Sequence, residues 1–185
     1  MGLDMYLDKT KKIKDMTLRQ ILDTYENVEA KKNGYTLEEW CGKSDENVCE
    51  DREAEVLALE HESHPAWAWE KDYTRKGIEE CIAYWRKANQ IHNWFVENVQ
   101  DGEDDCGLYE VTKDQLQELL YIAKAVDNHP STARELLPTI SGFFFGGTNY
   151  DKFYFDDIKE TIEQLTKVLN ETDFDNYYVY YSSSW

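Results

Sequence analysis

The sequence is short of basic residues. It holds 20 Lys plus Arg against 38 Asp plus Glu in 185 residues, which gives a formal net charge of −18. A deficit of this size argues against a broad basic surface, so we do not expect direct binding to nucleic acid or to anionic membranes. A partner with a basic surface, or a metal ion, would suit this charge better.

The sequence also lacks the segments that would take it to or across a membrane. No apolar run approaches the roughly 20 residues of a transmembrane helix. The first residues carry no basic region, and Tyr6 stands where a myristoylation signal needs Ser or Thr. Cys41, Cys49, Cys81 and Cys106 form no CxxC pair, which indicates reduced thiols. We therefore expect a soluble, intracellular protein.

Motifs of catalytic chemistry are missing as well. There is no GxSxG sequence, and no cysteine pairs with a histidine in a recognised signature. Gly142, Gly146 and Gly147 lack the Lys-Ser/Thr ending of a phosphate-binding loop. Nothing in the sequence identifies an enzyme, a catalytic residue or a cofactor.

Metal sites are not spelled out either. His61 and His64 could bind zinc from one face of a helix, but Pro65 argues against a continued helix and no four-ligand set is present. The acidic residues after position 100 resemble a calcium loop only in acidity, because the ligand order of an EF-hand is absent. The sequence predicts no metal centre.

Aromatic residues are plentiful, with six Trp, thirteen Tyr and seven Phe, and they supply the surface for a buried core. We expect one α+β domain over residues 1–185, with a central buried helix, several flanking helices and a small, mostly antiparallel sheet. An acidic excursion is expected at about residues 43–72. Capping signals and apolar spacing predict helices at 17–30, 75–99, 112–127 and 153–170. The strands are expected from the alternating N-terminus, the Phe143 segment and the tail 177–181.

The predicted central helix carries polar residues on its apolar face. Asn89 and His92 lie three apart among core-type residues, with Trp85 on the same face and Arg86 at its edge. A buried and unpaired polar group costs about 1–3 kcal/mol, so each must have a partner. The partner is either another group of the protein or an anionic ligand in a pocket. Trp85, Arg86, Asn89 and His92 are therefore the candidate ligand-binding residues.

The negative charge is uneven along the chain. Residues 43–72 hold ten acidic residues, and Asp101, Glu103, Asp104 and Asp105 form a second concentration just after the central helix. Such runs usually form solvated faces. The alternative is that Asp101, Glu103, Asp104 and Asp105 form an acidic interaction surface.

Several stretches resemble one family of proteins. The run YWRKANQIHNWFVENVQDG at 84–102, the opening MGLDMYL, the stretch LPTISGFFFGGTNYD at 137–151 and the closing Ser183-Ser184-Trp185 are similar to a largely uncharacterised family of small phage and prophage proteins. Residues 10–72 carry none of this resemblance. The resemblance implies a context, a phage accessory gene that acts against host functions in the cytoplasm of a bacterium, and it implies no activity for any residue.

Three functions are compatible with the sequence. The first is a non-enzymatic inhibitor that blocks a basic host protein, for instance by mimicking nucleic acid to evade host defence. The second is a pocket at Arg86, Asn89 and His92 that sequesters or processes a small phosphorylated molecule such as a nucleotide. The third is a structural or assembly role. The sequence specifies neither the partner nor the oligomeric state.

Overall fold

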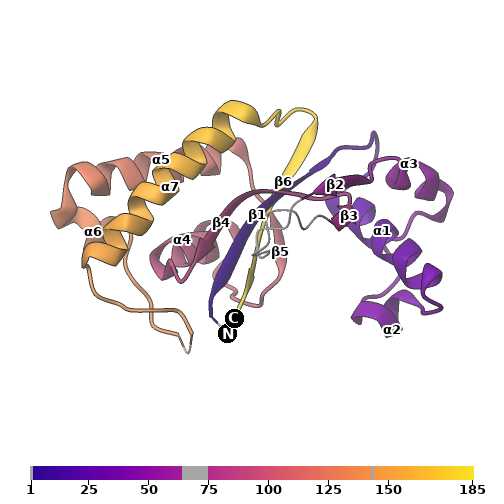
Figure 1. The fold of residues 1–185 in the computed structure, drawn as a ribbon, viewed down its shortest axis with the longest axis horizontal. Helices are drawn as coiled ribbons and strands as arrows, with labels where there is room; N and C mark the ends of the chain where they lie inside the picture. The colour runs from indigo at the N-terminus through magenta and orange to yellow at the C-terminus, as the bar shows by residue number, and fades with distance from the viewer. Residues whose placement is uncertain (1, 64–74, 143) are drawn as a thin grey trace. The chain divides into compact units, whose positions relative to one another are not determined.

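The computed structural model describes residues 2–63, 75–142 and 144–185. Helices combine with a four-stranded antiparallel sheet and a two-stranded hairpin, which confirms the predicted α+β class (Figure 1). The chain divides into two compact units. Unit 1 comprises residues 1–9, 81–175 and 179–185, and unit 2 comprises residues 10–80 and 176–178.

The four-stranded sheet lies largely in unit 1. Its strands are β1 (Asp4–Lys11), β4 (Glu80–Arg86), β5 (Leu108–Glu110) and β6 (Tyr177–Ser184), and their order is β4-β1-β6-β5. The alternation predicted for the N-terminus is confirmed, because Leu3, Met5 and Leu7 are all fully buried. The tail forms β6 and pairs antiparallel with β5, with Tyr109 opposite Tyr181.

The helices of unit 1 complete its core. They are α4 (Asn89–Val99), α5 (Lys113–Asn128), α6 (Ala133–Leu136) and α7 (Lys152–Glu171), with a 3-10 turn, η2 (Pro130–Thr132), before α6. α5 and α7 run side by side in Figure 1. The predicted capping box holds, since the Thr112 hydroxyl accepts from the backbone of Gln115 and the Gln115 side chain accepts from the backbone of Thr112.

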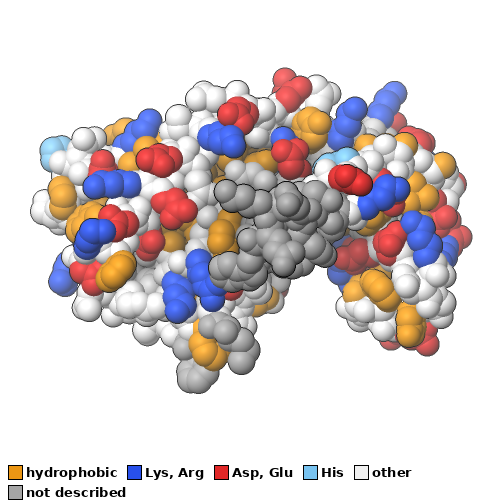
Figure 2. Space-filling view, in the orientation of Figure 1, with side chains coloured by type: hydrophobic (Ala, Val, Ile, Leu, Met, Phe, Trp, Pro, Cys, Tyr) orange, Lys and Arg blue, Asp and Glu red, His pale blue; other side chains and the backbone are white. Residues whose placement is uncertain are grey.

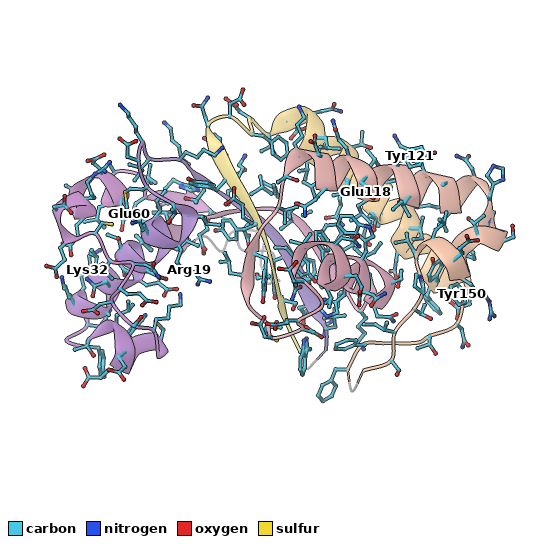
Figure 3. The ribbon with its side chains drawn as sticks, turned by 180° about the vertical axis from the view of Figure 1, so that it is seen from behind. Arg19, Lys32, Glu60, Glu118, Tyr121 and Tyr150 are labelled. Atoms are coloured by element: carbon cyan, nitrogen blue, oxygen red, sulfur yellow. The ribbon has the colours of Figure 1, made fainter. Side chains whose placement is uncertain are left out.

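Unit 2 is mainly helical. It contains α1 (Leu18–Lys32), α2 (Leu37–Cys41), η1 (Glu50–Arg52), α3 (Glu53–Leu57) and the hairpin of β2 (His61–Ser63) and β3 (Arg75–Gly77). Its acidic residues are partly neutralised by lysines. Lys31 contacts Glu50 and Glu53 at 2.8 and 3.0 Å, and Lys32 contacts Glu60 at 3.7 Å (Figure 3).

An acidic excursion was predicted at residues 43–72, and the structure describes only residues 43–63 of this stretch. Residues 43–63 hold η1, α3 and β2, and α3 packs against α1. The aromatic run 65–69 lies outside the described residues. That this stretch forms a variable excursion stays a prediction.

The predicted helix over 75–99 is wrong in its first half. Residues 80–86 form β4, in which Ala83 and Trp85, two apart, are buried on one face. A short run of aromatic and apolar residues fits a strand period as well as a helical one. The helix begins only at Asn89, after Lys87 adopts a positive φ of 62°. The remaining α4 is the expected central helix, with seven of its residues buried.

The Phe143 segment was expected to be a strand, and its described residues are not. Phe143 itself lies outside the described residues. Gly146 has a φ of 91°, which interrupts an extended backbone. The carbonyl of Phe144 accepts from the N–H of Leu3, and Phe145 packs edge-on against the His92 ring. The segment therefore covers α4 and contacts the start of β1 without extending the sheet.

One buried hydrogen bond of unit 1 gives a test of this packing. Trp85 Nε1 donates to Thr161 Oγ1 at 3.0 Å, and both residues are buried. Thr161→Val keeps the shape but leaves the indole N–H without its acceptor. We expect the free energy of unfolding to fall by about 1–3 kcal/mol in urea titrations. Thr148→Val, at an exposed position, should change it by less than about 0.5 kcal/mol. A neutral Thr161→Val would contradict the placement of β4 against α7.

Candidate functional site

His92 lies at the centre of unit 1 with no exposed surface. Its Nε2 lies 3.0 Å from Asp104 Oδ2, and its Nδ1 lies 2.7 Å from the Tyr181 hydroxyl. A carboxylate can only accept, so Nε2 carries the hydrogen in the pair with Asp104. In a neutral imidazole Nδ1 then accepts from Tyr181. The two candidate regions of the sequence, the α4 residues and the acidic run, are thus joined directly.

Tyr181 comes from the far end of the chain. Its ring stacks on Phe95 with centroids 4.0 Å apart, which fixes the hydroxyl against His92. Burial and, secondly, the charge of Asp104 raise the pKa of Tyr181 well above its ordinary value. The hydroxyl therefore keeps its proton and remains a hydrogen-bond donor.

Asp104 belongs to a loop that we call the acidic loop, residues 100–107. Its second carboxylate oxygen, Oδ1, accepts from Trp185 Nε1 at 3.1 Å, while Gln100 Nε2 donates to the Glu103 carbonyl at 2.6 Å. Asp105 Oδ1 accepts from the backbone of Gly107 and from the Tyr109 hydroxyl at 2.7 and 2.9 Å. These bonds hold both ends of the acidic loop in one conformation.

The remaining predicted ligand residues separate into two groups. Trp85 and Asn89 are buried and bonded within the protein. Asn89 Nδ2 donates to the carbonyls of Phe145 and Gly147, and its Oδ1 accepts from the N–H of Ile140. The expectation that Asn89 and His92 each have a partner is confirmed, and their partners are protein groups. Arg86 alone of the four is exposed.

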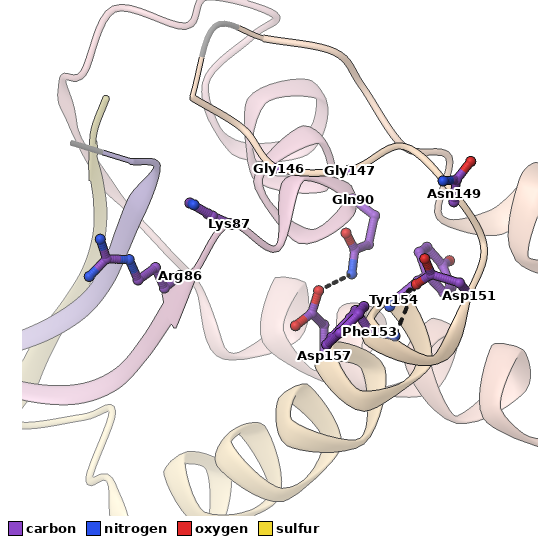
Figure 4. Close-up of a pocket in the computed structure, with 10 residues that line it drawn as sticks. All are labelled: Arg86, Lys87, Gln90, Gly146, Gly147, Asn149, Asp151, Phe153, Tyr154 and Asp157. Carbon is purple, nitrogen blue, oxygen red and sulfur yellow. Dashed lines mark hydrogen bonds between the residues drawn. The ribbon is translucent and has the colours of Figure 1, made fainter.

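Arg86 lines a cavity of about 300 Å³ in unit 1 (Figure 4). Three segments meet there: the turn from β4 into α4, the loop at Gly146 and Gly147, and the start of α7. Of the four residues that the sequence suggested for a ligand pocket, Arg86 lines this cavity, and Trp85, Asn89 and His92 do not.

The inner part of the cavity carries a hydrogen-bonded pair. Gln90 Nε2 donates to Asp157 Oδ2 at 3.1 Å, and Gln90 is only 2% exposed. Burial raises the pKa of Asp157 to about 6, and the nearby charges of Glu160, Asp156 and Asp151 act in the same direction. Ionisation of this carboxyl group is therefore costly in the folded chain.

Sequence reasoning missed Lys87, Gln90, Asp157 and Tyr181. Gln90 and Asp157 lie 67 residues apart, so no local spacing connects them. A usable signal existed only for Gln90, a polar residue inside an apolar run beside Asn89. All four cysteines are free, as predicted.

Comparison of the chain with models of protein families, with curated proteins and with solved structures finds no match. Within the described ranges, no helix is long and apolar enough to cross a membrane. No three His, Cys, Asp or Glu side chains among the described residues are grouped so that they could hold a metal ion. His61 lies on β2 with Nδ1 3.1 Å from the Leu59 carbonyl, and His64 lies outside the described residues.

Removing one hydroxyl tests the bonds around His92. Tyr181→Phe keeps the ring stacked on Phe95 but leaves His92 Nδ1 without a partner in a buried site. We expect a loss of about 1–3 kcal/mol in the free energy of unfolding. The control is Tyr121→Phe, because Tyr121 is 75% exposed on α5 (Figure 3), and it should be nearly neutral. Equal effects of the two substitutions would contradict the bond.

The raised pKa of Asp157 predicts a pH dependence. The folded chain holds the Asp157 proton more tightly than the unfolded chain, where the pKa is near 3.9, so ionisation costs stability as pH rises from about 4 to 6. Asp157→Asn removes that cost and retains an acceptor for Gln90. Relative to the parent, the variant should gain about 1 kcal/mol between pH 4 and pH 8, a figure reduced for partial solvent exposure. Urea unfolding of both proteins at the two pH values measures this gain, and a constant difference would refute it.

Proposed function

We propose that the protein is a non-enzymatic accessory protein of the phage type that binds and blocks a host protein through its acidic loop. The observation that carries this proposal is the His92–Asp104 pair, which fixes an acidic loop in a chain of net charge −18. The partner is a host protein with a basic surface. The resemblance to phage proteins supports the cytoplasm of a bacterium as the setting of this interaction.

The acidic loop offers its charge in a fixed arrangement. Asp104 and Asp105 accept the hydrogen bonds that shape the loop, whereas Asp101 and Glu103 are exposed. Within the described part of the chain, neither Asp101 nor Glu103 forms an ion pair. A charge that is already in place loses little conformational entropy on binding, so a fixed loop binds better than a mobile one of the same charge.

Other acidic regions are less suited to this role. In unit 2, Glu50, Glu60 and Glu26 pair with Lys31, Lys32 and Lys43. On the face of unit 1 shown in Figure 2, acidic and basic side chains are interspersed along α5 and α7. The acidic loop contains four carboxylates and no Lys or Arg.

Electrostatic attraction by such a loop would act mainly on the rate and specificity of association. If the basic surface of the partner normally binds nucleic acid, the loop acts as a mimic of the phosphate backbone. Contact with nucleic acid itself is disfavoured, because the charges have the same sign.

Two double variants with the same change of charge test this proposal. Asp101→Asn/Glu103→Gln neutralises the exposed carboxylates of the acidic loop, and Glu118→Gln/Asp127→Asn neutralises two exposed carboxylates of α5. Each tagged protein is used to capture partners from a lysate of bacterial host cells at low salt, followed by quantitative mass spectrometry. We expect a basic partner to be captured by the parent and the α5 variant and to bind the loop variant about tenfold less.

The same capture is repeated at increasing salt, which should release the partner as the charges are screened. Equal capture by the loop variant and the parent would contradict the proposal. If both double variants captured the partner equally poorly, binding would depend on the total charge of the protein and not on the acidic loop.

A further inference from the structure

The cavity beside Arg86 has a cationic rim. Arg86 and Lys87 follow one another at the end of β4, line the cavity on one side and are exposed, and their side chains extend outward from its rim, away from the Gln90–Asp157 pair (Figure 4). Among the described residues, no carboxylate lies within ion-pair distance of Lys87 Nζ. Arg86 Nε is 3.8 Å from Asp4, and its side chain is still 43% exposed. The two cations are adjacent in the sequence and keep hydrogen-bonding capacity for a ligand.

The backbone is shaped to place Lys87 at this rim. Lys87 has a φ of 62°, a conformation that non-glycine residues adopt rarely and that often accompanies function. Gly146, which has a φ of 91°, lies directly against Lys87 in the wall of the cavity. A Cβ at Gly146 would lie 3.1 Å from both Cβ and the carbonyl oxygen of Lys87, so a glycine permits this close approach.

The other end of the cavity accepts hydrogen bonds. The Asp157 carboxylate takes one hydrogen bond, from the buried Gln90, and adjoins the open volume. Carboxylates in such positions bind the hydroxyl groups of a sugar well, because each hydroxyl donates to an oxygen that has lone pairs to spare. Phe153, which is 76% exposed, adds an aromatic face at the edge of the cavity.

We propose that this cavity binds a ribose phosphate, with the phosphate at Arg86 and Lys87 and the sugar hydroxyls at Asp157. Two adjacent cations match the nearly two negative charges of a phosphate monoester, and Arg also matches its oxygen geometry. About 300 Å³ lies at the lower end of the range for small-molecule sites and suits one ligand of this size. The ribose phosphate can be free or part of a nucleoside monophosphate, whose base would contact Phe153.

Isothermal titration of the full chain tests the proposal with four probes: ribose 5-phosphate, AMP, adenosine and inorganic phosphate. We expect ribose 5-phosphate and AMP to bind, adenosine to bind at least tenfold more weakly than AMP, and inorganic phosphate at least tenfold more weakly than ribose 5-phosphate. Tighter binding of AMP than of ribose 5-phosphate identifies the nucleotide as the source of the ligand. Equal affinities identify the free sugar phosphate as sufficient.

Matched variants locate the site. Lys87→Gln should weaken binding of AMP about tenfold, since it removes one charge-assisted contact to phosphate. Asp157→Asn should weaken binding of ribose 5-phosphate without changing that of inorganic phosphate. Lys124→Gln removes the same charge as Lys87→Gln from an exposed position on α5 and should leave affinity unchanged. Urea unfolding of each variant confirms that it is folded before it is titrated.

Three results would overturn the proposal. They are the absence of heat with ribose 5-phosphate and AMP up to 10 mM, equal binding of inorganic phosphate and ribose 5-phosphate, and equal loss of affinity in Lys87→Gln and Lys124→Gln. The acidic loop contributes no residue to this cavity, so these results leave the proposed protein partner untouched.

Discussion

The hydrogen bond between His92 and Asp104 is the contact on which the functional account depends. A buried imidazole without partners would be costly, and here one ring nitrogen meets Tyr181 while the other meets a carboxylate of the acidic loop. Because Asp104 also accepts from Trp185, one carboxylate fastens the loop to α4 and to the C-terminal residue together. The charge of the acidic loop is therefore held in place by the core of unit 1.

The turn between β4 and α4 is the second constraint. Lys87 follows the last residue of β4 and has a positive φ, which turns the chain into α4. The helix therefore begins with two buried residues, Asn89 and Gln90, which lie on different sides of it. Asn89 binds the loop around Phe145, and Gln90 binds Asp157 on α7. One short segment thereby shapes the core and the cavity, which explains why polar residues stand inside an apolar run.

Much of the helical structure could be predicted from the sequence, because capping boxes such as Thr17 with Gln20 act within three residues. The strand β4 could not be predicted from the sequence, because contacts with residues distant in the chain determine its position. Trp85 bonds to a residue 76 positions away, and a helical period fits its neighbours equally well. At the site, sequence pattern singled out His92 and the acidic run separately. Their pairing, and the meeting of Gln90 with Asp157, depend on the tertiary fold.

Backbone ¹⁵N relaxation of residues 100–107 tests the central claim, that the acidic loop is fixed by His92, most directly. If the bonds of Asp104 and Asp105 hold, the order parameters of these amides should be close to about 0.85, the value of rigid backbone such as α4. Values below about 0.6 would show a flexible loop on the picosecond to nanosecond timescale and would contradict the account.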